Sequence, residues 1–125
     1  MPNRVLVVED DPKVAELLGR FLGDEYEVLV ARDGREAVAI AQASRPGLIL
    51  LDVGLPKLDG LNALRLLKTT ASTADIPVVM QSAMGQSDAL MEAETLGAVD
   101  YLIKPYTAED VVAMVRKYLV PWKDG

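Results

Sequence analysis

Residues 48–56, LILLDVGLP, decide the fold of this chain. Four aliphatic residues, Leu48–Leu51, have the all-apolar composition of a strand that is covered on both faces of a sheet. The run stops at a carboxylate, Asp52, and the turn residues Gly54 and Pro56 follow it. A charge at the end of such an apolar strand indicates that Asp52 serves a chemical purpose there.

The same pattern of an apolar run followed by a helical segment recurs along the whole chain. The other strand-like runs are Val5–Val8, Glu27–Ala31, Pro77–Gln81 and Val99–Ile103. Apolar residues between the runs follow helical spacing, as in Val14, Leu17, Leu18 and Phe21. Five β/α units of this kind predict a parallel sheet with helices on both faces and right-handed crossovers. We expect one domain over residues 1–120, with 121–125 as a tail or the start of a linker.

Composition excludes several classes of function. The net charge is −6, and the 13 lysines and arginines are scattered, so we expect neither a nucleic-acid surface nor an anionic membrane surface. No apolar run approaches the roughly 18 residues of a membrane span, and we expect a cytoplasmic protein. The chain has no cysteine and no histidine, which excludes disulfides, thiolate metal sites and an imidazole base. Any site chemistry must therefore use carboxylates, hydroxyls and lysine.

Polar residues stand where the predicted strands end. Ligands of open α/β sheets bind outside the carboxyl ends of the strands, so these positions are the candidates for a site. Asp11 has a structural role available, because it precedes Pro12 and can cap the helix that begins there. The remaining strand-end residues are Glu9 and Asp10, Asp52, Gln81-Ser82-Ala83, and Lys104-Pro105.

Electrostatics predicts what three acids at one sheet edge need. Two carboxylates about 4 Å apart repel by roughly 4 kcal/mol at an effective dielectric constant near 20, so the group takes up protons or holds a cation. Oxygen ligands alone favour a hard ion such as Mg²⁺, which commonly shares its coordination shell with a phosphate. With Lys104 as a second positive charge, the arrangement suits an aspartate that attacks a phosphoryl group in line.

The segment from Asp52 to Gly60, DVGLPKLDG, resembles the phosphoacceptor segment of response-regulator receiver domains. The resemblance covers about residues 4–119. It implies a flavodoxin-like (βα)5 three-layer sandwich with a five-stranded parallel sheet of order 2-1-3-4-5, which places the first and third strands side by side.

The resemblance also implies a role for each strand-end residue. Asp52 would be the phosphorylated residue, Asp10 a direct Mg²⁺ ligand and Glu9 an acid that acts on the metal mostly through water. The backbone carbonyl of Gly54 would be a further metal ligand. Ser82 and Lys104 would contact the phosphoryl group, and Tyr101 falls on the aromatic switch position.

These roles imply a receiver domain of a two-component system. It would take a phosphoryl group from a sensor histidine kinase or a histidine phosphotransfer protein and switch a surface for a downstream effector or output domain. It would catalyse only its own phosphorylation and dephosphorylation. The sequence leaves open a phosphorylation-dependent homodimer, and also whether the regulator stands alone or is part of a longer protein.

Three alternative functions use a similar fold. A haloacid-dehalogenase-type phosphatase needs a second aspartate two residues after the first, where this chain has Gly54. A flavodoxin-like carrier needs a phosphate-binding loop after the first strand, where this chain has the acids Glu9 and Asp10. A phosphorylation-independent interaction module would keep the fold and lose the chemistry, yet none of the acids, the hydroxyl or the lysine is missing.

Overall fold

A computed structural model of the chain describes residues 3–54 and 59–121. Its five strands form one parallel sheet in the order β2-β1-β3-β4-β5, which confirms the predicted topology. The strands are β1 (Arg4–Val8), β2 (Glu27–Ala31), β3 (Leu48–Asp52), β4 (Val78–Ala83) and β5 (Asp100–Lys104). The helices are α1 (Pro12–Leu22), α2 (Gly34–Ser44), α3 (Gly60–Thr69), α4 (Ser87–Leu96) and α5 (Ala108–Tyr118).

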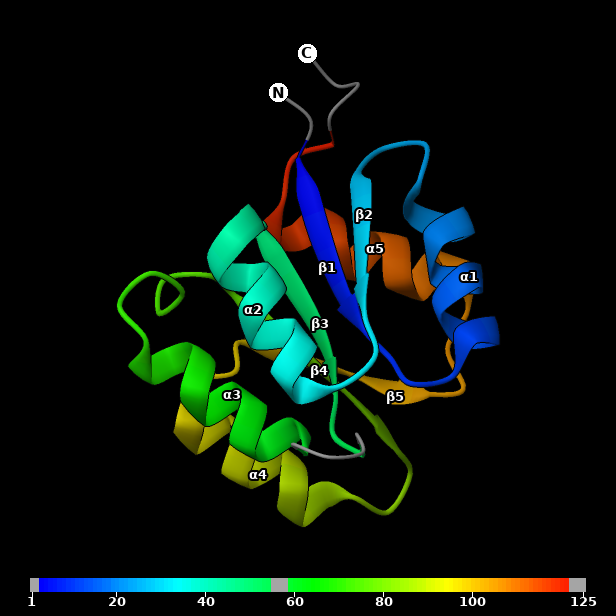
Figure 1. The fold of residues 1–125 in the computed structure, drawn as a ribbon. Helices are drawn as coiled ribbons and strands as arrows, with labels where there is room; N and C mark the ends of the chain where they lie inside the picture. Colours follow the sequence, from blue (N-terminus) through cyan, green and yellow to red (C-terminus); the bar gives the residue numbers. More distant parts are fainter. Residues whose placement is uncertain (1–2, 55–58, 122–125) are drawn as a thin grey trace.

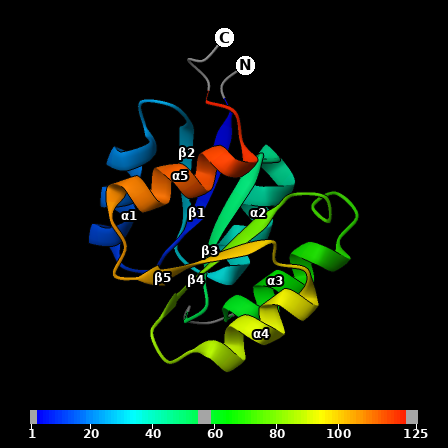
Figure 2. The same ribbon diagram turned by 180° about the vertical axis from the view of Figure 1, so that it is seen from behind.

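The helices form two layers with the sheet between them. Helices α1 and α5 cover one face, and α2, α3 and α4 cover the other (Figures 1 and 2). Alternate residues of each strand enter the two cores: Ile49 and Leu51 of β3 pack on the α2–α4 side, and Leu48 and Leu50 pack on the α1/α5 side. All five residues of β3 are buried, as the opening apolar run predicts.

The polar ends of three strands belong to the sheet itself. Asp52 is the last residue of β3, and Lys104 is the last residue of β5. The fourth strand was predicted to end at Gln81, but it begins at Val78 and continues through Ser82 to Ala83. The parallel ladder explains this extension, because Ser82 and Ala83 pair with Ile103 and Lys104 of β5. Ser82 is thus held by backbone pairing on a strand rather than on a loop.

Helix α1 begins as predicted. Asp11 is its N-cap and accepts a hydrogen bond from the backbone N–H of Lys13 at 2.9 Å, with Pro12 in the first turn. Asp11 therefore has the capping role, which leaves Glu9 and Asp10 for the site.

Three segments lie outside the described residues, and besides 1–2 two of them bear on the predictions. One is 55–58, which includes Pro56, and the other is 122–125, which is most of the predicted tail. Within residues 3–54 and 59–121, none of the helices is long and apolar enough to cross a membrane.

Candidate functional site

Three carboxylates meet at the carboxyl ends of β1 and β3. Glu9, Asp10 and Asp52 each offer an oxygen, and these oxygens lie within 4.8 Å of one another. The sheet produces this meeting, because Val8 at the end of β1 pairs with Leu51 of β3. Glu9 is 2% exposed and Asp52 is 8% exposed, whereas Asp10 is open to solvent. The cluster thus has two buried carboxylates and one solvent-exposed carboxylate, so a ligand can reach it from the side of Asp10.

Lys104 reaches this cluster from β5. Its Nζ donates to Asp52 Oδ2 at 2.8 Å and to Glu9 Oε1 at 3.1 Å. Burial alone would lower the pKa of the lysine, but the contacts with Asp52 and Glu9 outweigh it and raise the pKa to about 12. The ammonium therefore stays charged beside the two buried acids.

Glu9 is the most deeply buried acid of the cluster. Burial raises the pKa of its carboxyl, and the charge of Asp52 raises that pKa further. Lys104 and the backbone N–H of Asp11, which donates to Glu9 Oε2 at 3.3 Å, act in the opposite direction. One lysine thus does not fully compensate the buried acids, and the site favours a further cation.

Both oxygens of Asp52 have fixed partners. The backbone N–H of Gly54 donates to Oδ1 at 2.9 Å, and Lys104 donates to Oδ2. The next residue, Val53, donates its N–H to the carbonyl of Gln81 at 2.9 Å, so the strand end is held as well. Asp52 is therefore a preorganised carboxylate on a rigid element.

Gly60 contributes to this rigidity, although sequence reasoning gave it no role. A Cβ at this position would overlap the carbonyl oxygen of Asp52 and would lie 2.7 Å from the Cα of Val53. The N–H of Gly60 donates to the carbonyl of Val53 at 3.1 Å. Only glycine lets the start of α3 approach the end of β3 this closely, and the glycine that follows the N-cap Asp59 is the signal that could have revealed it.

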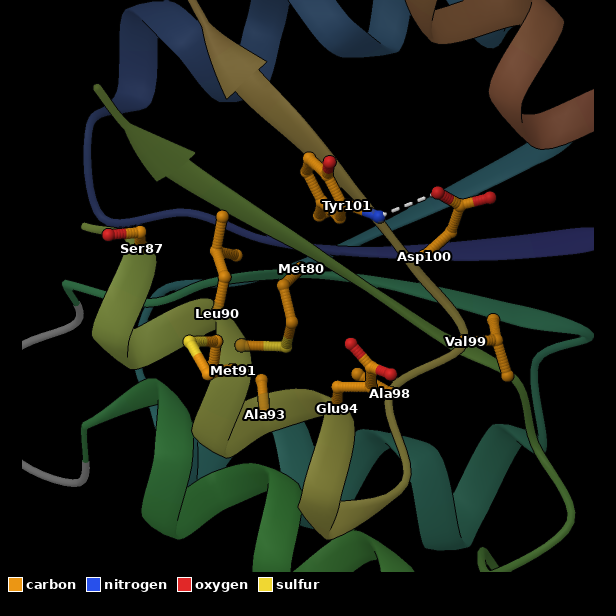
Figure 3. A pocket seen from close by; sticks show the side chains of 10 residues that line it. All are labelled: Met80, Ser87, Leu90, Met91, Ala93, Glu94, Ala98, Val99, Asp100 and Tyr101. Carbon is orange, nitrogen blue, oxygen red and sulfur yellow. Dashed lines mark hydrogen bonds between the residues drawn. The ribbon is translucent and has the colours of Figure 1, made fainter. Parts of the chain in front are cut away.

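Ser82 and Tyr101 lie outside the acid cluster. Ser82 is buried one residue beyond Gln81, the β4 partner of Asp52, and its Oγ has no hydrogen-bond partner among the described residues. Tyr101 is 53% exposed on β5, where it lines a cavity of about 590 Å³ between α4 and β5. Figure 3 shows Met80, Leu90 and Met91 gathered in this cavity. The structure thus joins Glu9, Asp10, Asp52 and Lys104 directly and leaves Ser82 and Tyr101 as neighbours of that group.

A polar pair beside the site was not predicted as a pair. Gln81 is fully buried on β4, and its Oε1 accepts a hydrogen bond from the hydroxyl of Tyr106 at 2.5 Å. A polar residue at the end of an apolar run is the sequence signal for Gln81. Its partner lies 25 residues away, and no local pattern identifies it.

The donor set fits a hard divalent cation. Three carboxylates provide the oxygen ligands that Mg²⁺ prefers, and the described residues place only one lysine against them. The exposure of Asp10 leaves room for water and for a phosphate on the same ion. Carboxylate, cation and lysine together can stabilise a phosphoryl group in transfer to an aspartate.

Sequence comparison finds relatives that match nearly the whole chain. The family model described as the response regulator receiver domain matches residues 5–116. The DNA-binding dual master transcriptional regulator RpaA of Synechocystis is 40% identical over 117 residues, which cover 93% of this chain and 48% of RpaA. Response regulator MprA of Mycolicibacterium vanbaalenii is 40% identical over 120 residues, which cover 95% of this chain and 51% of MprA. The chain therefore spans about half the length of these curated relatives.

Solved structures show the same fold. Chemotaxis protein CheY4 of Vibrio cholerae superposes with a TM-score of 0.89 at 28% identity, over 95% of this chain and all of CheY4. A putative response regulator from Chloroflexus aurantiacus gives a TM-score of 0.88 at 34% identity, over 94% of this chain and 98% of that protein.

Proposed function

The chain belongs to the response regulator receiver domain family, and on this premise we propose that Asp52 is its phosphoacceptor. One observation carries the proposal: Asp52 ends a fully buried strand with both of its oxygens positioned, beside two further acids and a lysine. The donor is the phosphohistidine of a sensor histidine kinase or of a histidine phosphotransfer protein. An oxygen of Asp52 forms the new bond to phosphorus while the phosphorus–nitrogen bond breaks, and the histidine leaves with the electrons of that bond.

Mg²⁺ is the proposed cofactor. Asp10 and Asp52 would hold it directly, Glu9 would act mostly through water, and the carbonyl of Gly54 would be a further ligand. When bound, the ion supplies charge neutralisation at the transferring phosphoryl group. A bound ion would offset the repulsion among the three acids, so metal binding and acceptor chemistry would depend on the same residues.

Lys104 and Ser82 would bind the phosphoryl group. The Lys104 ammonium already contacts the acceptor carboxylate, so a small movement brings it to a phosphoryl oxygen. Ser82 offers a buried hydroxyl without a partner in the described residues, on the strand next to Asp52. Its donation to the phosphoryl group would satisfy this hydroxyl.

The product is a signal rather than a released compound. The curated relatives are response regulators rather than classical enzymes, and we propose that this chain catalyses only its own phosphorylation and dephosphorylation. The modification adds about −1.5 to −2 charges at Asp52. The cavity beside Tyr101 gives its ring a place to turn inward when β4 and the segment after it rearrange. The changed surface would then bind an effector or an output domain, or a second copy of the chain.

The name of one relative supports a proposal for where the signal acts. RpaA is named a DNA-binding regulator, and this chain matches about half of it. We propose that the chain acts in the cytoplasm as the receiver part of a regulator. Its own charge of −6 disfavours contact with DNA, so the output function would lie outside this domain.

Labelling with a small phosphodonor tests the proposal. Phosphoramidate with Mg²⁺ should add one phosphoryl group, and peptide mass spectrometry should place it on Asp52. Omission of the metal should abolish the labelling, and so should Asp52→Asn. Full labelling of Asp52→Asn, or labelling that is equal with and without Mg²⁺ or Mn²⁺, would refute the assignment.

A further inference from the structure

The fully buried Gln81 holds a side chain from the segment that follows β5. Its Oε1 accepts a hydrogen bond from the Tyr106 hydroxyl at 2.5 Å. Tyr106 packs against the apolar core on the α1/α5 side of the sheet. The Nε2 of Gln81 has no hydrogen-bond partner among the described residues. Because an apolar residue of similar size would avoid this unsatisfied donor, stability alone does not explain a glutamine here.

Gln81 is the lateral neighbour of Asp52. In the sheet register Asp52 pairs with Gln81, and Gln81 pairs in turn with Leu102 of β5. Paired residues of parallel strands direct their side chains to the same face. The side chains of Asp52 and Gln81 therefore stand next to each other on the α1/α5 face.

The short segment 104–106 begins with Lys104, the last residue of β5, and ends with Tyr106, before α5 starts at Ala108. Lys104 reaches from it to Asp52 on β3, and Tyr106 reaches from it to Gln81 on β4. The segment is thus tied to two laterally paired residues. A lysine side chain has a flexible four-carbon stem, so the position of its ammonium depends on how firmly its backbone is held.

We propose that Gln81 and Tyr106 are positioning residues that hold Lys104 in place beside Asp52. The inference rests on the proposed function, since Lys104 matters there as the cation that contacts the phosphoryl group. Burial raises the pKa of the Tyr106 phenol to about 12. The phenol therefore remains a donor to Gln81 at physiological pH. The Tyr106–Gln81 hydrogen bond then persists while the ammonium of Lys104 moves from Asp52 to a phosphoryl oxygen.

Two variants remove the Tyr106–Gln81 hydrogen bond, one at the donor and one at the acceptor. Tyr106→Phe removes the donor, and Gln81→Leu removes the acceptor without opening the core. Tyr26→Phe is the matched control, because the buried Tyr26 donates its hydroxyl to the carbonyl of Leu119 at 2.7 Å, far from the acid cluster. If Tyr106→Phe does not fold, Gln81→Leu alone carries the test, since it leaves only the less buried phenol unpaired.

The first readout needs no phosphoryl group. The side-chain ammonium of Lys104, followed by nitrogen-15 NMR in the metal-free protein, should give a protected signal that Asp52→Asn weakens. The signal should weaken likewise in Tyr106→Phe and Gln81→Leu, and it should persist in Tyr26→Phe. An unchanged Lys104 signal in both Tyr106→Phe and Gln81→Leu would overturn the inference, whatever the outcome for phosphorylation.

The second readout is the rate of phosphorylation by phosphoramidate at saturating Mg²⁺. We expect about tenfold slower labelling in both variants, since a small misplacement of a catalytic group is costly. In the Lys104→Ala background, Tyr106→Phe should slow labelling less than about twofold further, because its effect passes through Lys104. A full additional tenfold loss there would show a general structural effect instead and overturn the inference. A wild type that is not labelled at all would refute the proposed function, whereas the NMR result would still decide the inference.

Discussion

Asp10→Asn is the substitution that most directly tests the acid cluster. Asp10 is the solvent-exposed member of the three carboxylates, and asparagine keeps its shape while it removes its charge. Asp11→Asn is the matched control at the next position. Asparagine caps a helix about as well as aspartate, and Asp11 is not part of the cluster.

The magnitude follows from the distances. At 4.8 Å, two unit charges repel by about 0.9 kcal/mol in bulk water and by about 3.5 kcal/mol at an effective dielectric constant near 20. The exposure of Asp10 favours the lower limit, and the ammonium of Lys104 offsets part of the repulsion from its two partners, Glu9 and Asp52. We therefore expect Asp10→Asn to raise the unfolding free energy of the metal-free protein by up to about 1 kcal/mol, while Asp11→Asn should change it little.

Mg²⁺ should stabilise the wild type more than it stabilises Asp10→Asn. A ligand at 100 times its Kd stabilises the folded state by about 2.7 kcal/mol. If Asp10→Asn raises the Kd tenfold, the same Mg²⁺ concentration adds only about 1.4 kcal/mol.

Urea unfolding followed by circular dichroism, with EDTA and then with Mg²⁺, measures both effects. Equal responses of Asp10→Asn and Asp11→Asn, or a metal-free Asp10→Asn less stable than wild type, would refute the assignment of Asp10 to the metal site.

Three further predictions concern the response, the lifetime and the packing of the site. Lys104→Arg keeps the charge but changes its shape, and Ser82→Ala removes one phosphoryl contact. Both variants should still accept phosphate, but beryllofluoride should change the amide NMR chemical shifts from β4 to α5 less than in the wild type. Shift changes as large as those of the wild type would contradict this prediction. Gly54 and the exposed Met84 offer little to orient a water for attack on the phosphorus, so the phosphorylated domain should lose its phosphate slowly. Gly54→Asn and Met84→Glu should each raise the rate of dephosphorylation, and their effects should be non-additive in the double variant. Among the described residues, a Cβ at Gly54 meets one atom, Asp52 Oδ1, at 3.8 Å, so Gly54→Asn has room against them; decay of the wild type within seconds would exclude this view. Gly60→Ala should destabilise the domain by about 1–3 kcal/mol in urea unfolding because its methyl overlaps strand backbone, and a neutral effect would show that α3 can shift away.

The sequence pattern predicted the parallel sheet, and the resemblance to receiver domains supplied the strand order that brings the core of the site together. Parallel strands bring their carboxyl ends to one edge, so acids after the first and third strands must meet if those strands are neighbours. The described structure confirms this for Glu9, Asp10 and Asp52, with Lys104 added from β5. The proline that follows Asp11 separated the helix cap from the site residues, and the structure confirms that role as well.

The sequence was not sufficient where long-range contacts decide. Polar side chains at Gln81 and Ser82 favoured the end of a strand, but backbone pairing with β5 does not depend on side-chain polarity and extends β4 to Ala83. The buried Gln81 is accommodated by Tyr106, and the close approach of Gly60 to Asp52 arises only when α3 packs. Each of these features depends on a partner that the local sequence does not specify.

In the proposed function, the unpartnered hydroxyl of Ser82 would couple phosphorylation of Asp52 to the conformation of β4. A buried polar group without a hydrogen bond costs about 1–3 kcal/mol, and Ser82 Oγ is such a group in the described structure. A phosphoryl group on Asp52 would supply the missing acceptor only in an arrangement that brings the end of β4 toward it. That arrangement alone recovers the cost, so it gains about 5- to 150-fold in population relative to the other. The same backbone carries Gln81, whose bond to Tyr106 links it to the segment that bears Lys104. The strand that would receive the phosphoryl contact is therefore also the strand whose Gln81 binds Tyr106, and a shift of β4 would be transmitted to the segment before α5.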